Sequence, residues 1–242
     1  MNAHATPLHT MAVPKRGRRQ SARPRSQRSI ARERMVEAAL EQFAAQGYDR
    51  ASLSDIAKPL GVTAPLLLYH FDSKEKLWMQ SIDLLFKRLD TVLEAAIDDG
   101  RSRDPHAAAE LLVRRLVYFF AAEPSFCRVL AHESTTPSAR LDWLADRHLT
   151  HVFGQIEEVL ERAVATGSLK PAPPAQTLLM ILGAASKFLE SQALIEAVYG
   201  QKALERDGID DYTERVVDLC FHGLVAEGSF GDRASALRAA SA

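Results

Sequence analysis

Residues 52–71, SLSDIAKPLGVTAPLLLYHF, form the stretch that decides the fold. Ser52 is followed three residues later by Asp55, a spacing that starts a helix because the hydroxyl and the carboxylate satisfy backbone N–H groups that lack partners. An apolar stripe over a very short helix ends at Gly61, a residue that tolerates the positive φ of a tight turn. The first half of the stretch therefore predicts one short helix and a sharp turn.

A second short helix is predicted after the turn, and longer helices flank the pair. Thr63 is placed to cap this helix, and Pro65 falls in its first turn, where a missing N–H costs little. Hydrophobic periodicity predicts a helix over 29–46 before the pair and another over 73–99 after it. The arrangement is typical of a helix-turn-helix, whose second helix enters the major groove of DNA while the first packs across its back. On spacing alone, an ordinary corner between two helices remains the alternative.

The remaining sequence predicts further helices and no sheet, because it contains no convincing two-residue alternation bounded by hairpin signals. The breaks fall at prolines and glycines, and the expected helices cover 105–122, 124–135, 138–166, 173–200 and 210–227. The predicted fold class is therefore all-α, with about nine helices.

The net charge of −1 conceals a separation of charge along the chain. Residues 1–32 contain eight basic residues and no acidic one, which leaves 22 basic and 31 acidic residues, a net charge of −9, for residues 33–242. A cationic arm on an acidic body is associated with binding to polyanions. A disordered arm that only aids solubility, or a misassigned start codon, explains the charge equally well.

The composition argues against several classes of protein. The shares of hydrophobic and charged residues, 47% and 25%, are typical of a globular chain. Cys127 and Cys220 form neither a disulfide framework nor a metal-ligand spacing, and they suit a reducing compartment. The N-terminus lacks the apolar segment of a secretory signal, and the longest apolar run, 178–185, is too short to span a bilayer. We therefore expect a cytoplasmic protein with no membrane association, no metal and no cofactor.

Residues 29–80 strongly resemble the DNA-binding domain of TetR-family regulators. The resemblance is carried by Ala38-Ala39-Leu40, Phe43, Gly47-Tyr48, Ser52-Leu53-Ser54-Asp55-Ile56-Ala57, Gly61-Val62-Thr63, Tyr69-His70-Phe71, Ser73-Lys74-Glu75 and Leu77. The other two thirds of the chain resembles the family in the number, length and order of its helices. The resemblance implies a repressor that binds a palindromic operator as a homodimer and is released by a small-molecule effector. It also argues against the helix-corner alternative.

The resemblance also implies the domain organisation, with a three-helix DNA-binding domain followed by a larger helical domain. We expect a disordered basic arm over 1–28, a helix-turn-helix domain over 29–75, a ligand-binding and dimerisation domain over 76–228, and a flexible tail over 229–242.

The same resemblance places the helix after Gly61 in the major groove of double-stranded operator DNA. The residues then expected to contact DNA are Ser52, Thr63, Ala64, Pro65, Leu66, Tyr69, His70 and Lys74, with Ser52 and Lys74 on phosphates. Leu67 and Phe71 are expected in the core. Leu68 stands where the family often has a tyrosine, and the apolar residues 64–66 lack the groups that read purine edges.

The expected DNA-binding domain is itself not basic, since residues 29–80 hold six Lys or Arg against seven Asp or Glu. We therefore hypothesise that arginines of the arm, Arg25 and Arg28 among them, enter the flanking minor groove and compensate for this lack of charge.

The last two long helices are expected to form the homodimer, as the resemblance implies. Residues 178–186 are apolar nearly all round, which a helix tolerates only when it is covered on several sides. Gly183, Ala184 and Ala185 are small enough to let a partner helix approach closely. Packing within one chain is the alternative.

An effector site is expected between the helix over 73–99 and the dimer helices. Its expected residues are Phe119, Phe126, His132, Trp143, Phe153, Phe188 and Gln192, with Glu133, Lys187 and Glu190 as further polar candidates. Aromatic residues at helical spacing are also what a simple core contains. A mostly apolar site suggests a small apolar or aromatic effector, whose binding would tilt the helix over 73–99 and change the separation of the two recognition helices.

Two other classes of function fit the sequence less well. No sequence feature supports an enzyme, because no nucleophile elbow, phosphate-binding glycine loop or set of metal ligands is present. An architectural DNA-binding protein without an effector remains possible on sequence alone. His148 and His151 have a spacing that can hold a metal, but two histidines without a third ligand more often lie on a solvated face.

Overall fold

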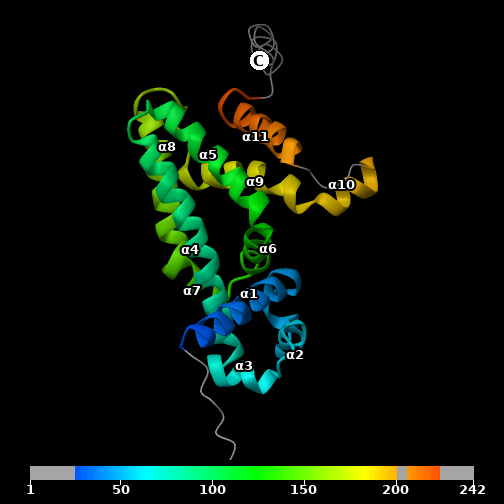
Figure 1. Cartoon of the computed structure of the whole chain (residues 1–242). Helices are drawn as coiled ribbons and strands as arrows, with labels where there is room; N and C mark the ends of the chain where they lie inside the picture. Colours follow the sequence, from blue (N-terminus) through cyan, green and yellow to red (C-terminus); the bar gives the residue numbers. More distant parts are fainter. Residues whose placement is uncertain (1–24, 201–205, 224–242) are drawn as a thin grey trace, which may run out of the picture.

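The computed structural model describes residues 25–200 and 206–223 as helices joined by short loops (Figure 1). No strand occurs among these residues, in agreement with the predicted all-α class. The helices are α1 (Arg25–Arg50), α2 (Leu53–Ala57), α3 (Ala64–Phe71), α4 (Lys74–Gly100), α5 (Pro105–Ala122), α6 (Pro124–Glu133), α7 (Ala139–Leu144), α8 (Thr150–Ala165), α9 (Pro174–Glu190), α10 (Gln192–Tyr199) and α11 (Arg206–Phe221).

The helix-turn-helix forms as the sequence predicts. Ser52 caps α2, and its Oγ accepts a hydrogen bond from the backbone N–H of Asp55 at 3.1 Å. A 3₁₀ turn over Lys58–Leu60 follows, and Gly61 ends it with a φ of 64°. Thr63 is the residue before α3, but its side chain makes no capping hydrogen bond, so the expected cap by its hydroxyl is not formed.

Helix α1 is longer than the predicted 29–46. It begins at Arg25, four residues earlier, and it runs to Arg50 with a bend at Gly47, where φ is 75° and ψ is 163°. The first 24 residues of the predicted arm lie outside the described residues, as does the predicted tail over 229–242.

Helix α4 joins the two ends of the molecule. Its predicted apolar face is observed, since Trp78, Ile82, Leu85, Leu89 and Ala96 are buried and Val92 is half-buried. The helix packs against α1 at one end and along α5 over much of its length. Figure 1 shows α1, α2 and α3 gathered at one end of the molecule, with α4 rising from them beside α7 and α8. One apolar core runs from this end into the body.

Three further expected helices differ from the observed ones. The helix predicted over 138–166 contains a π-helical turn at Ala145–Leu149, which separates α7 from α8. The helix predicted over 173–200 breaks at Ser191, so that α9 and α10 meet at an angle of 60°. The helix predicted over 210–227 begins at Arg206 and ends at Phe221.

Among the described residues, no one helix has the length and apolar character needed to cross a membrane. The bent pair of α9 and α10 meets that test by length and composition alone.

Candidate nucleic-acid interface and effector cavity

Helix α3 turns one face to the core and the other to solvent. Leu67 and Phe71 are fully buried, as expected for core residues. Leu66, Leu68 and Tyr69 are exposed, and 80% of the Tyr69 surface is accessible. An eight-residue helix that exposes two leucines and a tyrosine leaves a surface that no described part of the chain covers. This surface is the candidate DNA-reading face.

The other residues expected to contact DNA lie around this face. Thr63 and Pro65 are exposed, Ala64 and His70 are half-buried, and the ring of His70 lies 5.4 Å from that of Tyr69. Ser52 is close by in the chain, but its hydroxyl already donates to the Asp55 carboxylate at 2.6 Å.

Lys74 is held within the chain. Its Nζ lies 3.4 Å from the carbonyl oxygen of Asp49 and 4.5 Å from the ring centroid of Tyr48. A phosphate contact therefore requires the ammonium group to leave these partners or to share them. Arg25 and Arg28 fall in the first turns of α1, but their side chains lie outside the described residues.

A cavity of about 170 Å³ lies in the body between α5, α6 and α9. Apolar side chains form most of its wall, and its lining residues are Phe120, Phe126, Cys127, Leu130, Ala131, Ser134, Leu182, Ser186 and Glu190. It is the candidate effector site.

One side of the cavity is polar. Ser186 donates a hydrogen bond to Glu190 Oε1 at 2.9 Å, and Lys187 Nζ lies 3.3 Å from Oε2 of the same carboxylate. Burial raises the pKa of the Cys127 thiol to about 12, so this sulfur stays protonated at neutral pH. The wall thus offers a carboxylate acceptor within apolar surroundings.

The residues expected to bind the effector are only partly brought together. Phe126 lines the cavity, and so does Glu190 among the further polar candidates. Phe119 is buried and does not line the cavity, and its ring centroid lies 5.6 Å from that of Phe126. The sequence did not predict several lining residues, among them Ser186, Cys127, Leu130 and Leu182. Helical periodicity gave no signal for them, because it does not distinguish a buried core face from a cavity wall.

The other expected effector residues lie elsewhere in the described part of the chain. Trp143 packs against Trp78, and Phe188 packs against Tyr212. Phe153 is half-buried against the core. The Gln192 side chain donates to the Phe188 carbonyl oxygen at 2.7 Å. His132 faces α1, where its Nε2 lies 3.2 Å from the carbonyl oxygen of Ala44.

Helix α6 connects the cavity to the helix-turn-helix. Its middle residues line the cavity, whereas Glu133 at its end is buried and pairs with Arg140, with 3.1 Å between Oε2 and Nε. The Arg140 guanidinium also lies 4.3 Å from the ring centroid of Tyr48, next to the Lys74 contact described above. A displacement of α6 would therefore reach Lys74, at the start of α4, through the side chains of Arg140 and Tyr48.

Exposed apolar residues mark a separate surface on α9 and α11. Leu179, Met180 and Leu219 are exposed, and 74% of the Met180 surface is accessible. Gly183 lies on the same helix as Leu179, and nothing lies within 4 Å of the place where a Cβ would stand. The two helices pack against each other.

Comparison with known proteins identifies both parts of the chain. Residues 35–78 match the model of the tetR family of bacterial regulatory proteins, and residues 105–220 match a tetracyclin repressor-like C-terminal domain. Together the two matches cover about two thirds of the chain.

Two relatives illustrate the similarity. IcaR of Staphylococcus aureus, a negative transcriptional regulator of a biofilm operon, is 24% identical over 128 residues, which cover 53% of this chain and 62% of IcaR. The match thus spans less than two thirds of that relative. RaaS of Mycobacterium tuberculosis, an HTH-type transcriptional regulatory protein, is 26% identical over 84% of this chain and 91% of its own length.

The solved structure of FadR from Bacillus subtilis with stearoyl-CoA has the same fold. Its TM-score is 0.59 at 18% identity, and the alignment covers 80% of this chain and 99% of FadR. The helix-turn-helix geometry, the helical body and the matches to both domain models agree. The chain belongs to the tetR family of bacterial regulatory proteins.

Proposed function

We propose that this protein is a cytoplasmic transcription repressor that binds a palindromic operator as a homodimer and is released by a small apolar or aromatic molecule. The exposed face of α3 is the observation that carries the proposal. Burying such a surface in the major groove would let Tyr69, Leu66 and Thr63 contact base edges and thymine methyl groups.

Base recognition at this face would depend on apolar contact and DNA shape. The exposed positions of α3 carry no arginine, asparagine or glutamine, the side chains that pair with purine edges through two hydrogen bonds. Sequence-dependent groove width and deformability then contribute more of the specificity.

The apolar surface on α9 and α11 supports the dimer. A self-complementary contact between two copies would cover Leu179, Met180 and Leu219 and would present the two α3 helices to successive major grooves, about 34–36 Å apart. Gly183 would allow close approach of the partner helix.

The size of the cavity favours a small effector. Its volume of about 170 Å³ lies below the usual 300–1,000 Å³ of ligand pockets and close to the ~150 Å³ that holds a benzene molecule. Stearoyl-CoA, the ligand in the FadR structure, is far larger. A ring-sized apolar molecule with one hydrogen-bond donor directed at Glu190 fits the wall best.

Binding to DNA is tested with two matched tyrosines. Duplexes are first selected from genomic fragments with the purified full-length chain, and their affinity is then measured by fluorescence anisotropy. We expect Tyr69→Ala to weaken binding to the selected duplex at least tenfold. Tyr199→Ala, which removes another exposed ring, on α10, should leave the affinity unchanged. Equal affinity for all fragments, selected or not, would instead indicate an architectural protein.

The effector site is tested with the two cysteines. Small aromatic and apolar compounds are screened for release of the selected duplex from the wild-type protein. A compound that releases it should fail against Cys127→Leu, which fills part of the cavity, and should still act on Cys220→Leu, whose side chain lies on α11 away from the cavity lining. A compound that releases the duplex from both variants would act at a site other than this cavity.

The dimer is tested by sedimentation. Met180→Glu places a charge on the proposed contact and should shift the protein toward the monomer at micromolar concentration. Leu68→Glu changes an exposed leucine at the opposite end of the molecule and should not. A monomeric wild-type chain would exclude the proposed mode of operator binding.

A further inference from the structure

Helices α5 and α11 are joined by polar side chains that recur every four residues on each helix. From α5 the Tyr118 hydroxyl donates to Asp210 Oδ1 at 2.8 Å, and one turn earlier Arg114 pairs with Glu214. Because the pairs run in opposite directions along the two helices, the same spacing predicts Glu110 opposite Asp218 and His106 opposite His222.

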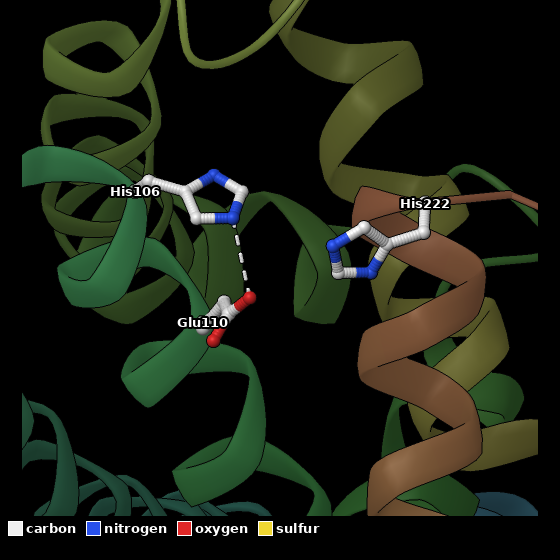
Figure 2. A group of neighbouring side chains, drawn as sticks. All are labelled: His106, Glu110 and His222. Atoms are coloured by element: carbon white, nitrogen blue, oxygen red, sulfur yellow. Dashed lines mark ion pairs between the residues drawn. The ribbon is translucent and has the colours of Figure 1, made fainter.

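This last part of the contact differs from the two cross-helix pairs. His106 Nε2 lies 3.2 Å from Glu110 Oε1 on its own helix, and His222 Nδ1 lies 3.6 Å from Asp218 Oδ1 on its own helix. One ligand atom from each of His106, Glu110 and His222 lies within 4.8 Å of the other two. Figure 2 shows the three side chains turned toward one another from the two helices.

We propose that His106, Glu110 and His222 bind a divalent transition-metal ion, Zn²⁺ in the first instance, which ties the start of α5 to the end of α11. Imidazole nitrogen and carboxylate oxygen are preferred zinc ligands, at about 2.0–2.2 Å from the metal. Two adjacent ligands of a tetrahedral site are then roughly 3.3 Å apart. The separation between His106 and Glu110 already fits this value.

The third ligand needs only a small movement. His222 must approach the other two by at most about 1.5 Å to reach the tetrahedral spacing. Its side chain is 61% exposed, so it can rotate without displacing the core. Asp218 stands beside Nδ1 of this imidazole, where it would fix the tautomer and leave Nε2 as the metal ligand.

Charge at the site favours a divalent cation. When both imidazoles are neutral, as metal binding requires, Glu110 and Asp218 give the group two negative charges. The carboxyl end of α11 adds a favourable partial charge, and the amino end of α5 opposes it. Since these two helix-end effects offset one another, the two carboxylates make the net charge at the site negative.

The aromatic surroundings hold one ligand in place. The Phe221 ring lies edge-on to His106 with 5.3 Å between centroids, which limits rotation of this imidazole. Two histidines and one carboxylate leave a fourth position for water, the arrangement of an open zinc site. A surface ion pair between His106 and Glu110 alone would not require His222, which comes from the end of α11.

The test is calorimetric titration of ZnCl₂ into the full-length chain after treatment with EDTA. We expect one Zn²⁺ per chain, and His106→Gln, Glu110→Gln and His222→Gln should each lower the affinity at least tenfold. His151→Gln, which changes an exposed histidine on α8, should leave the affinity unchanged. Circular dichroism checks that each variant keeps its helices.

Hydrogen exchange separates a bridge between helices from a site on one helix. Bound Zn²⁺ should slow amide exchange both in the first turns of α5 and in the last turn of α11. Protection of α5 alone, absence of saturable binding, or equal affinity of His222→Gln and the wild-type chain would each overturn the proposal. None of these measurements involves DNA or an effector, so they stand apart from the proposed function.

Discussion

The buried carboxylate of Glu133 and the guanidinium of Arg140 form an ion pair between the end of α6 and the start of α7. Only 4% of Glu133 is exposed, whereas about a quarter of the Arg140 side chain is. Because the same guanidinium contacts Tyr48, this pair forms one connection between the effector cavity and the DNA-reading end, beside the direct packing of α6 against α1.

Loss of Arg140 should destabilise the protein strongly. Arg140→Met leaves the Glu133 charge buried without a partner, and breaking a buried pair in this way costs about 3–5 kcal/mol. Urea unfolding measures the loss. The double variant Glu133→Leu with Arg140→Met removes both charges and should recover most of the stability. If the two single changes were simply additive, the pair would have no energetic role.

Acid should weaken the fold through His148. Burial lowers the pKa of this imidazole, the Asp83 carboxylate at 3.0 Å partly opposes that effect, and the ring stacks on Phe86. The unfolded chain therefore binds a proton more readily than the folded one, so this contribution to stability is present above pH 6.5 and is lost as the pH falls from 6.5 toward the lower folded pKa.

The measurement is the free energy of unfolding at several pH values between 8 and 5. His148→Gln should flatten the decline below about pH 6.5, the ordinary histidine value. The exposed His151 supplies the control, since His151→Gln should keep the wild-type slope. An unchanged slope in His148→Gln would assign the pH dependence to other groups.

Backbone strain is concentrated at Asp72, between α3 and α4. Among the described residues this is the one position other than glycine with a positive φ, at 63° with ψ at −41°, and the next N–H bonds back to Phe71 O at 2.8 Å. Such a tight turn is rare and strained. Asp72→Val should be less stable than Asp72→Gly by about 1–3 kcal/mol.

Thermal unfolding ranks these variants. Lys76→Met removes the exposed ion pair with Asp72 and leaves the backbone as it is, so it should cost no more than about 0.5 kcal/mol. Equal stability of the valine and glycine variants would show that position 72 relaxes without cost.

The basic arm should strengthen operator binding through charge. Removal of residues 1–24 leaves α1 whole and deletes Lys15, Arg16, Arg18, Arg19 and Arg23. We expect weaker binding to the selected duplex and a shallower dependence on salt, by about 0.9 in the logarithmic slope for each phosphate that the arm no longer neutralises. Replacing the same five residues with glutamine in the full-length chain should reproduce the effect. An unchanged slope would leave residues 1–24 no part in DNA binding.

The sequence predicted those elements whose signals are local. Ser52, Gly61 and Pro65 act within their own turns, and the helices that they delimit are where periodicity placed them. The break at Ser191 and the π-helical turn over Ala145–Leu149 carry no glycine or proline, so nothing in the local pattern distinguished them from continuous helix.

The candidate sites were harder to predict, because they depend on distant segments. Phe126 and Glu190 meet at one cavity, although each belongs to a helix whose apolar face also forms core. No metal was expected, since sequence spacing showed no ligand set. The cluster of His106 with His222 joins positions 116 residues apart, and only the packing of α5 against α11 brings them together.

The absence of a side chain at Gly47 has a mechanical consequence. A methyl group there would stand 3.4 Å from the His132 imidazole, and the backbone is already at a φ that other residues avoid. The helix-turn-helix end and the helical body thus meet in close contact at this bend in α1. We expect a shift of α6 to be passed to α1 through this contact between Gly47 and His132.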